Sequence, residues 1–205
     1  MSKLLYQGHG SFRIETNNNK IIYVDPFIET GCEKIADLIL ITHDHFDHIN
    51  TSILKKSDDC TIIKYSDALI EREYRTFFKD DIKITSVQAY NKNHDINSCV
   101  GYIIEFDGIK VYASGDTSKT QDMSNKLSKM NLTYALLCCD GVYNMDIEEA
   151  SECAKIINAK YTIPIHTAPV SSETDAKNPP YDLVKAQNLN CNGKIILKPG
   201  EEIEL

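Results

Sequence analysis

The sequence predicts a mixed α/β (α+β) fold, built as a single domain over residues 1–205. Its first third consists of short apolar stretches separated by glycine- and asparagine-rich turns, which is typical of consecutive strands. The later part alternates between strand-like and helical patterns, without an internal repeat or a linker. A chain of 205 residues, with 42% hydrophobic and 25% charged residues, is long enough to bury one core. A β-rich start followed by interleaved helices and strands indicates the mixed class.

The first four elements are strands, and the fourth leads into a cluster of histidines. Three short strands form a predicted meander at Leu4–Gln7, Ser11–Glu15 and Ile21–Val24. The continuous apolar run Leu38–Thr42 has the length of a strand and indicates one that is buried on both faces. The histidines begin directly after this run. They are therefore expected in a loop at the carboxyl end of a strand.

Later segments predict further strands, one clear helix and a surface loop. Strands are expected at Thr61–Lys64, Ile82–Val87, Val100–Phe106, Ile109–Ala113, Tyr161–Ile165 and, as the terminal strand, near Lys194–Leu197. The residue types of Asp107 and Gly108 favour a tight hairpin turn. From Asp146 an apolar stripe recurs at helical spacing, with two glutamates in the first turn, where the helix dipole favours negative charge. The polar, proline-containing stretch Val170–Tyr181 predicts a surface loop before a short helix.

Charge and composition limit the partners that this chain can have. A formal net charge of −8 and only three arginines leave no basic surface for a phosphate backbone, so no nucleic-acid partner is expected. No stretch approaches the roughly 20 apolar residues that a spanning helix needs, and the first residues lack a leader pattern. We therefore expect no membrane partner and a cytoplasmic location. The sequence carries no signal for the oligomeric state.

The cysteines do not form a recognisable metal or disulfide pattern. All seven are scattered without a Cys-x-x-Cys pair, which predicts reduced thiols. Cys138 and Cys139 lie in the apolar, strand-like run Tyr134–Cys139 and are interpreted as core residues, not as soft metal ligands. Metal ligands are therefore sought among the histidines and carboxylates.

Three of the six histidines lie within Thr-His-Asp-His-Phe-Asp-His at 42–48. In an extended loop, imidazoles two residues apart project to the same side, while the following Asp-His pair turns toward a neighbouring point. The four groups of His43, His45, Asp47 and His48 can therefore serve two adjacent metal positions. A solvated polar loop with chance histidines is the alternative. The apolar strand that leads directly into the cluster argues against it.

The pattern His-x-His-x-Asp-His after an apolar strand resembles the signature of the metallo-β-lactamase superfamily. Three later features agree in order, spacing and context: His94 in AYNKNHD, Asp116 in SGDTS and His166 in IPIHT. Shorter motifs resemble a small bacterial and archaeal branch that includes ascorbate-phosphate lactonase-like hydrolases. These motifs are GHGSF at 8–12, VDP at 24–26, VGY at 100–102 and DGVY at 140–143.

This resemblance implies a four-layer αββα sandwich of two mixed β-sheets, with the metals at one edge of the sheets. It implies one metal held by His43, His45 and His94, a second held by Asp47, His48 and His166, and Asp116 bridging both. For His94 the alternative is an ordinary exposed histidine in an asparagine-rich loop. Asp25 either supports the site or is a turn residue.

The implied donor set of five imidazoles and two carboxylates is rich in nitrogen, which favours two Zn²⁺ ions, with Mn²⁺ and Fe²⁺ as alternatives. Such metals lower the pKa of a shared water beside a carbonyl or phosphoryl centre, which predicts a metal-dependent hydrolase. The expected partner is a small-molecule substrate with an ester, lactone, amide or phosphodiester bond, and the metals make an anionic one acceptable. The resemblance suggests that Asp47 also orients the water or takes its proton. His9 and Tyr143 are candidate donors to the substrate, with a strand-edge histidine and a core tyrosine as the alternatives.

Three other functions stay open as alternatives. An iron-dependent redox enzyme of the same fold usually has Glu in place of His45 and a flavin domain after the metal domain, whereas this chain has His45 and stops at Leu205. A non-catalytic metal or ligand sensor would be expected to have lost ligands, and none is missing from the pattern. A nuclease is disfavoured by the acidic balance. The bond that is attacked cannot be read from the sequence, because substrate choice depends on the shape of loops.

Overall fold

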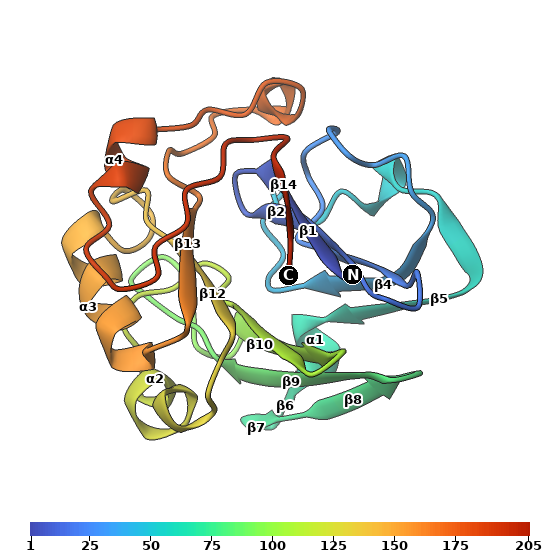
Figure 1. Ribbon diagram of the computed structural model, residues 1–205, viewed down its shortest axis with the longest axis horizontal. Coiled ribbons are helices and arrows are strands. Elements are labelled where there is room, and N and C mark those ends of the chain that lie inside the picture. Colours follow the sequence, from blue (N-terminus) through green and yellow to red (C-terminus); the bar gives the residue numbers. More distant parts are fainter.

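Two six-stranded β-sheets pack face to face in the computed structural model, which describes all residues from 1 to 205 (Figure 1). In spatial order, the first sheet contains β14 (Glu202–Glu204), β1 (Lys3–Gly8), β2 (Ser11–Glu15), β3 (Ile21–Val24), β4 (Ala36–Ile41) and β5 (Lys56–Lys64). The second contains β13 (Tyr161–Ile165), β12 (Tyr134–Cys138), β11 (Ile109–Ala113), β10 (Val100–Phe106), β9 (Ile82–Gln88) and β8 (Thr76–Lys79). A small hairpin of β6 (Leu69–Ile70) and β7 (Glu73–Tyr74) lies beside β9.

Each sheet combines an antiparallel meander with parallel strands. In the first sheet, β14, β1, β2 and β3 are antiparallel neighbours, and β3, β4 and β5 run parallel. In the second, β8, β9, β10 and β11 are antiparallel, and β11, β12 and β13 run parallel. The predicted mixed α/β (α+β) sandwich is confirmed. Parallel neighbours direct their carboxyl ends to the same sheet edge, which is where ligands bind in such sheets.

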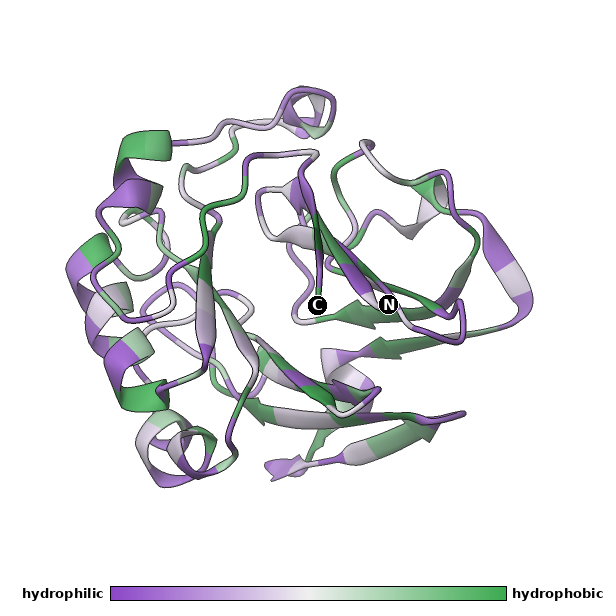
Figure 2. Ribbon diagram, in the orientation of Figure 1, coloured by the Kyte–Doolittle hydropathy of each residue, from purple (hydrophilic) through white to green (hydrophobic).

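The main core fills the space between the two sheets. In β4, Leu38 and Leu40 point into this core, whereas Ile39 belongs to a separate cluster on the outer face. In β12, Leu136 points inward and Leu137 outward. Strands of this kind are buried on both faces, which is why they appear in the sequence as continuous apolar runs. Figure 2 shows the apolar residues concentrated on these strands and the hydrophilic ones on the connecting loops.

The outer layers of the sandwich differ from each other. The second sheet is flanked by α2 (Gln121–Asn125), α3 (Ile147–Ile157) and α4 (Leu183–Gln187), next to β12 and β13 in Figure 1. The outer face of the first sheet carries a 3-10 turn, η1 (Thr51–Ile53), and loops that pack on the outer cluster. Three other short elements are α1 (Tyr65–Ala68), η2 (Leu127–Lys129) and η3 (Glu173–Ala176). One outer layer is thus helical and the other is mainly loop.

The helix α3 forms where the sequence predicts it. The carboxylate of Asp146 caps its first turn by accepting a hydrogen bond from the amide of Glu149 at 2.8 Å. Asn158, in the left-handed conformation with φ of 53°, ends it. Its buried face covers β12, where Cys138 and Cys139 are buried core residues, as predicted.

Most predicted strands are confirmed, and three regions differ. The expected terminal strand near Lys194–Leu197 is wrong. Only Lys194 forms an isolated bridge, to Thr162, and the final strand is β14, which pairs with β1. Leu197 is buried in the core, because the chain crosses there from one sheet to the other. The short strands β6, β7 and β8 were not predicted. The expected surface loop Val170–Tyr181 contains η3 and buries Val170.

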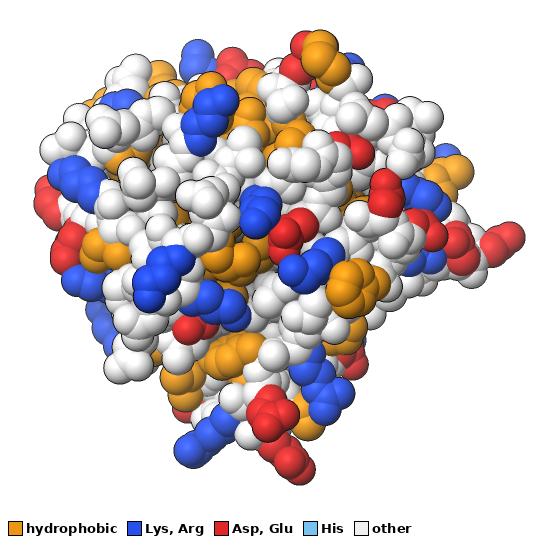
Figure 3. All heavy atoms as spheres, turned by 60° about the horizontal axis from the view of Figure 1, so that its bottom comes forward, with side chains coloured by type: hydrophobic (Ala, Val, Ile, Leu, Met, Phe, Trp, Pro, Cys, Tyr) orange, Lys and Arg blue, Asp and Glu red, His pale blue; other side chains and the backbone are white.

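The surface carries charges of both signs. On the face that Figure 3 shows, Lys and Arg side chains are interspersed with Asp and Glu, and they form no continuous basic patch there. Interspersed charges do not create the extended positive potential that attracts nucleic acid. None of the helices has both the length and the apolar character needed to cross a membrane.

Candidate metal centre

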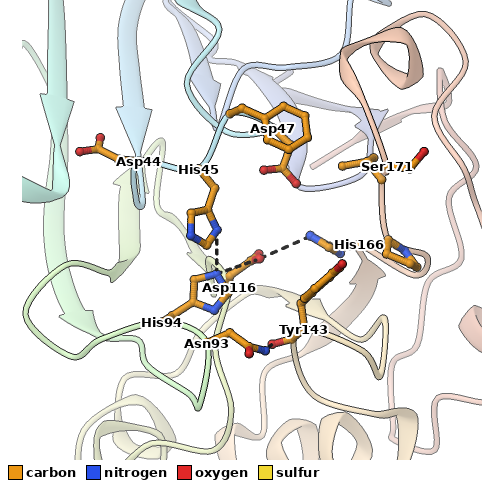
Figure 4. Close-up of a pocket in the computed structure, with 12 residues that line it drawn as sticks. Asp44, His45, Asp47, Asn93, His94, Asp116, Tyr143, His166 and Ser171 are labelled. Atoms are coloured by element: carbon orange, nitrogen blue, oxygen red, sulfur yellow. Dashed lines mark hydrogen bonds and ion pairs between the residues drawn. The ribbon is translucent and has the colours of Figure 1, made fainter.

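The seven side chains predicted as metal ligands converge at one edge of the sandwich, and Figure 4 shows five of them, His45, Asp47, His94, Asp116 and His166. They come from the loop after β4, the β9–β10 loop, the turn after β11 and the turn after β13. In chain order they are His43, His45, Asp47, His48, His94, Asp116 and His166. All except His45 and Asp47 are buried. Segments that are far apart in the sequence therefore bring imidazoles and carboxylates to one place.

Asp116 lies at the centre of this cluster. Its Oδ2 is 3.4 Å from Nε2 of His94 and 3.5 Å from Nε2 of His166. The same carboxylate is 3.6 Å from Nε2 of His48 and 3.9 Å from Nε2 of His43. One carboxylate thus faces four imidazole nitrogens, which is the arrangement that a bridging ligand requires.

The turn that presents Asp116 depends on Gly115. This glycine has a φ of +60°, a conformation that side chains rarely adopt. A Cβ there would lie 2.9 Å from the Cβ of Thr42 and 2.9 Å from the carbonyl oxygen of Val100. Only glycine allows the β11 turn to approach the end of β4 this closely, so Asp116 reaches the histidine loop.

His43, His45 and His94 form the first group of potential ligands. Nε2 of His94 lies 3.2 Å from Nδ1 of His45, and Figure 4 shows the two rings pointing toward each other. Nδ1 of His43 is 2.9 Å from the hydroxyl of Thr42, and Nδ1 of His94 is 2.9 Å from the side-chain oxygen of Asn91. The His94 side chain is only 3% exposed. The alternative of an ordinary exposed histidine therefore does not apply to it.

His9, Asp47, His48 and His166 form the second group. Nδ1 of His48 lies 2.9 Å from Oδ2 of Asp25, and Nδ1 of His166 lies 3.1 Å from Oδ2 of Asp140. Asp25 also accepts hydrogen bonds from the amide and the hydroxyl of Thr42, at 2.8 and 2.7 Å. Asp25 thus orients His48 and is more than a turn residue. Both imidazoles turn their Nε2 atoms toward Asp116.

The residues of the centre fit metal ions. The Nε2 atoms of His43, His48 and His166 are buried and have no hydrogen-bond partner in the protein. Buried polar atoms are nearly always paired, so three unpaired nitrogens around one carboxylate indicate a missing partner. Neutral imidazole and carboxylate are the ligands with which divalent metals such as zinc are held in proteins. The donor set therefore fits the metal centre that the sequence predicts.

The two groups differ in their electrostatics. Burial, together with the neighbouring His48, lowers the pKa of His43 well below its usual value, and burial also lowers the pKa of His94. Burial alone would lower the pKa of His48, but Asp116 and Asp25 outweigh it and raise this pKa to about 9. Asp116 and the second carboxylate, Asp140, likewise outweigh burial at His166 and raise its pKa to about 10.

His9 belongs to the second group and does not reach the open pocket. Its side chain is 0% exposed, and its Nε2 lies 2.9 Å from Oδ2 of Asp47. Its ring centroid is 3.6 Å from that of His166. Burial, and then the charge of His166, lowers the pKa of His9 to about 4, so a neutral His9 donates its Nε2–H to Asp47. His9 was expected to donate directly to a substrate. In the structure it contacts Asp47 instead and does not line the pocket.

The contact between His9 and Asp47 also acts on the carboxylate. Burial would raise the pKa of Asp47, but the hydrogen bond from His9 and the charge of His48 hold it below its usual range. Asp47 is 14% exposed, so its carboxylate lies between the buried histidine and the open pocket. It is therefore both anchored and accessible.

Tyr143 lies on the wall of the pocket that opens over the centre. It is 50% exposed, so the alternative of a core tyrosine does not apply. Its amide donates a hydrogen bond to Oδ1 of Asp140 at 2.7 Å. Figure 4 shows its side chain reaching toward the middle of the pocket. Asp140 thus connects Tyr143 to His166.

Three supporting residues were not assigned from the sequence. They are Thr42, Asn91 and Asp140, which contact His43, His94 and His166 respectively. A signal existed for Asp140, because it follows an apolar strand directly, as His166 does and as the histidine loop does. Asn91 had no such signal. It lies among several similar asparagines in a polar loop.

Comparison with known proteins gives consistent results. Residues 3–166 match the family described as the beta-lactamase superfamily domain. A protein of Thermococcus onnurineus named UPF0173 metal-dependent hydrolase is 32% identical, in an alignment that covers 100% of both chains.

Two solved structures with the same architecture extend the comparison. A metallo hydrolase from the hyperthermophilic archaeon Ignicoccus hospitalis is 25% identical, with a TM-score of 0.71 over 99% of this chain and 98% of that one. A diiron β-hydroxylase from Streptomyces venezuelae is 13% identical, with a TM-score of 0.71 over 100% of this chain and 54% of that one. The second likeness concerns the fold alone.

Proposed function

This chain belongs to the metallo-β-lactamase superfamily, and on that premise we propose that it is a metal-dependent hydrolase that works with two divalent metal ions. The observation that carries the proposal is the set of buried, unpaired Nε2 atoms around Asp116. Seven donor groups exceed the four that one tetrahedral ion accepts, which supports two ions. The name metal-dependent hydrolase, borne by the relative from Thermococcus onnurineus, supports the reaction class.

Each metal position has its own ligands in this proposal. His43, His45 and His94 hold the first position, and Asp47, His48 and His166 hold the second. Asp116, which faces imidazoles of both groups, would be a ligand to both ions. The nitrogen-rich set favours Zn²⁺, with Mn²⁺ and Fe²⁺ as alternatives. The far ring nitrogens of His43, His48 and His94 are held by protein oxygens, which fixes the orientation of these ligands.

When bound, the two ions supply Lewis-acid chemistry that activates water and polarises the oxygen of the scissile group. Asp47 is placed to handle the proton of the attacking water, because its carboxylate faces the pocket while His9 holds Oδ2. The hydroxyl group of the water adds to the acyl or phosphoryl centre, and the proton passes by way of Asp47 to the leaving group. Tyr143, on the opposite wall, is the candidate donor to the substrate.

The bond that is cleaved is an ester, lactone, amide or phosphodiester bond of a small molecule. A non-catalytic sensor is less well supported, because no predicted ligand is turned away from the centre. A redox enzyme would need iron at the same positions. The alternatives therefore differ in what the loaded protein does, and one set of assays separates them.

The proposal is tested by removing metal with a chelator and reloading the protein with Zn²⁺, Mn²⁺ or Fe²⁺ separately. Each form is assayed on lactones, thioesters, phosphodiesters and β-lactams, and metal content is measured in parallel. We expect metal-dependent hydrolysis of at least one class. Asp47→Asn should lose about 100-fold or more in turnover and far less of its metal. Asp58→Asn, an exposed carboxylate on β5, is the matched control and should change neither.

Other outcomes would contradict the proposal. Two bound metals without hydrolysis of any class would favour the sensor. Oxygen consumption by the Fe²⁺ form, without hydrolysis, would favour the redox enzyme. Equal losses of metal and turnover in Asp47→Asn would reduce Asp47 to a ligand.

A further inference from the structure

The pocket over the candidate metal centre has a polar floor and largely apolar walls. Its volume is about 670 Å³, within the range of sites that bind small organic molecules. The floor consists of ligand residues from both positions. The walls include Phe46, Tyr143, Pro169 and Val170. No Lys or Arg occurs among the twelve lining residues, so the only cationic side chains that could face a bound molecule are the imidazoles of the floor.

One wall is a rigid apolar surface formed by Phe46 and Val170. Phe46 is 46% exposed, yet its ring packs edge-on against Phe27, with centroids 5.8 Å apart and planes at 88°. Phe27 and Val170 belong to the same small cluster, with Ile28 and Ala176 behind them. The exposed ring of Phe46 is therefore held in place from behind. A fixed aromatic face that is left open beside a reactive floor is typical of a binding surface.

The opposite wall is formed by Tyr143 and Asn93. The carbonyl of Tyr143 accepts hydrogen bonds from the side-chain amides of Asn93, at 2.8 Å, and Asn91, at 3.1 Å. Figure 4 shows Tyr143 and Asn93 on one side of the pocket and Asp47 and Ser171 on the other. Two anchored aromatic residues from separate loops thus border one space.

The upper part of this space lacks a cationic side chain that would favour an anionic group. The charged side chains of the lining, apart from the imidazoles, are the carboxylates of Asp44, Asp47 and Asp116. Asp44 points away from the centre in Figure 4. An anionic tail between Phe46 and Tyr143 would lose hydration without gaining a cation partner, which is costly. Only the reacting group, at the floor, would meet metal ions.

We propose that the substrate is a neutral acyl compound whose apolar chain or ring lies between Phe46 and Tyr143. This inference rests on the proposed hydrolase function for the reacting group, and on the walls alone for the apolar group. It departs from the expectation that an anionic substrate is accepted. The metal ions would attract charge at the floor, but the walls hold only neutral donors, such as Ser171 and Tyr143, and no Lys or Arg for a phosphate or carboxylate placed farther out.

The first test compares two esters that differ only in a distal charge. These are 4-nitrophenyl hexanoate and mono-4-nitrophenyl adipate, assayed on the metal-loaded protein. We expect kcat/KM to be at least about tenfold higher for the neutral ester than for the charged one. Phe46→Ala should lower kcat/KM for the hexanoate about tenfold and for 4-nitrophenyl acetate by less, because the longer chain loses more apolar contact. The control is Phe78→Ala on β8, where the ring is 74% exposed and distant from the pocket lining.

The second test measures binding without a reaction. The ligands are 4-nitrophenyl hexyl ether and 4-nitroanisole, titrated into the metal-free and the metal-loaded protein. In both forms, the affinity for the hexyl ether should be at least about tenfold higher than that for the methyl ether. Phe46→Ala should remove most of this difference. Phe78→Ala should keep it.

The outcomes separate this inference from the proposed function. Equal use of the adipate and hexanoate esters, or a Phe46→Ala variant that behaves like Phe78→Ala, would overturn the inference. Binding of the hexyl ether that depends on Phe46, without hydrolysis of either ester, would support the apolar site and count against the hydrolase. Hydrolysis of the esters without binding that depends on Phe46 would support the hydrolase and count against the apolar site.

Discussion

The two proposed metal positions use similar ligands but different supporting residues. At the first position, the far nitrogens of His43 and His94 contact the neutral oxygens of Thr42 and Asn91. At the second, the far nitrogens of His48 and His166 contact the carboxylates of Asp25 and Asp140. A carboxylate behind an imidazole makes it more basic and fixes its tautomer more firmly than a neutral oxygen does. We therefore expect the second position to hold its ion more strongly and to exchange it less readily.

The histidine ligands of the two positions also differ in solvent exposure. His45, at the first position, is an exposed residue, whereas His48 and His166, at the second, are 1% and 2% exposed. The most exposed ligand therefore belongs to the first position, although Asp47 and His166 of the second position also line the open pocket.

Removing the carboxylate common to both positions should have the largest effect. Asp116→Ala is expected to weaken metal binding at both positions and to lower turnover on the order of 10³-fold, because both ions lose a ligand. Elemental analysis gives the metal content, and assays give the turnover. Thermal unfolding with and without metal shows how much of the stabilisation by bound metal has been lost. Asp58→Ala on β5 serves as the control. If Asp116→Ala kept two ions at wild-type affinity, Asp116 would not be the ligand that the two positions share, and another group would have to bridge them.

Single ligand substitutions should separate the two positions. His45→Ala is expected to leave about one ion per chain, at the second position, and His166→Ala about one ion, at the first. Stepwise competition with a chelator distinguishes them, because the remaining ion should be released more slowly from His45→Ala than from His166→Ala. If both variants lost both ions, the positions would not be independent.

The supporting residues should have smaller and unequal effects. Asp140→Asn keeps the shape of the side chain but removes its charge, and we expect metal affinity at the second position to fall about 10- to 100-fold. Asn91→Ala removes a neutral contact behind His94, and the first position should lose less. Metal titrations of both variants give the two losses. Equal losses would contradict the distinction between carboxylate and neutral support.

Replacing His9 should affect turnover more than metal content. His9→Ala is expected to keep both ions and to lower turnover about tenfold or more, equivalent to about 1.4 kcal/mol of transition-state stabilisation. His9 helps to hold the pKa of Asp47 low, so its removal should raise that pKa and move the acidic limb of the pH–rate profile to higher pH. His9→Gln, which can still donate a hydrogen bond, should recover part of the loss. Loss of one ion from His9→Ala would instead identify His9 as a ligand.

The smallest expected effect is a difference in how metal uptake depends on pH. Without metal, His48 and His166, whose pKa values are raised to about 9 and 10, carry protons at neutral pH that an incoming ion must displace. His43 and His94, whose pKa values are lowered, are already neutral there. Affinity at the second position should therefore increase more steeply between pH 6 and pH 9. Calorimetry in buffers of different ionisation enthalpy counts the released protons, and equal counts for both steps would contradict the assignment.

Much of the fold could be predicted because the strands have clear bounds in the sequence. Runs such as Val100–Phe106 and Tyr161–Ile165 are apolar and end at turn residues or at a functional residue. The final strand was misplaced because Leu197 is as apolar as a strand residue, although it is buried where the chain crosses between the sheets. Its partner, β1, lies at the other end of the chain. Pairing between such distant segments leaves no local pattern.

The residue patterns, and the family resemblance that they carry, were enough to predict the fold class and the residue types of the centre. The motif at 42–48 is contiguous, and His94, Asp116 and His166 follow in recognisable contexts, so a pattern of residues was enough to predict the ligand set. The residues that support these ligands, and the residues that border the pocket above them, could be identified only from the three-dimensional structure. His9 meets Asp47 across 38 positions, and Phe46 and Tyr143 come from separate loops. Ligand chemistry depends on residue type, which a sequence states directly, whereas support and substrate fit depend on distances that only the packed sheets create.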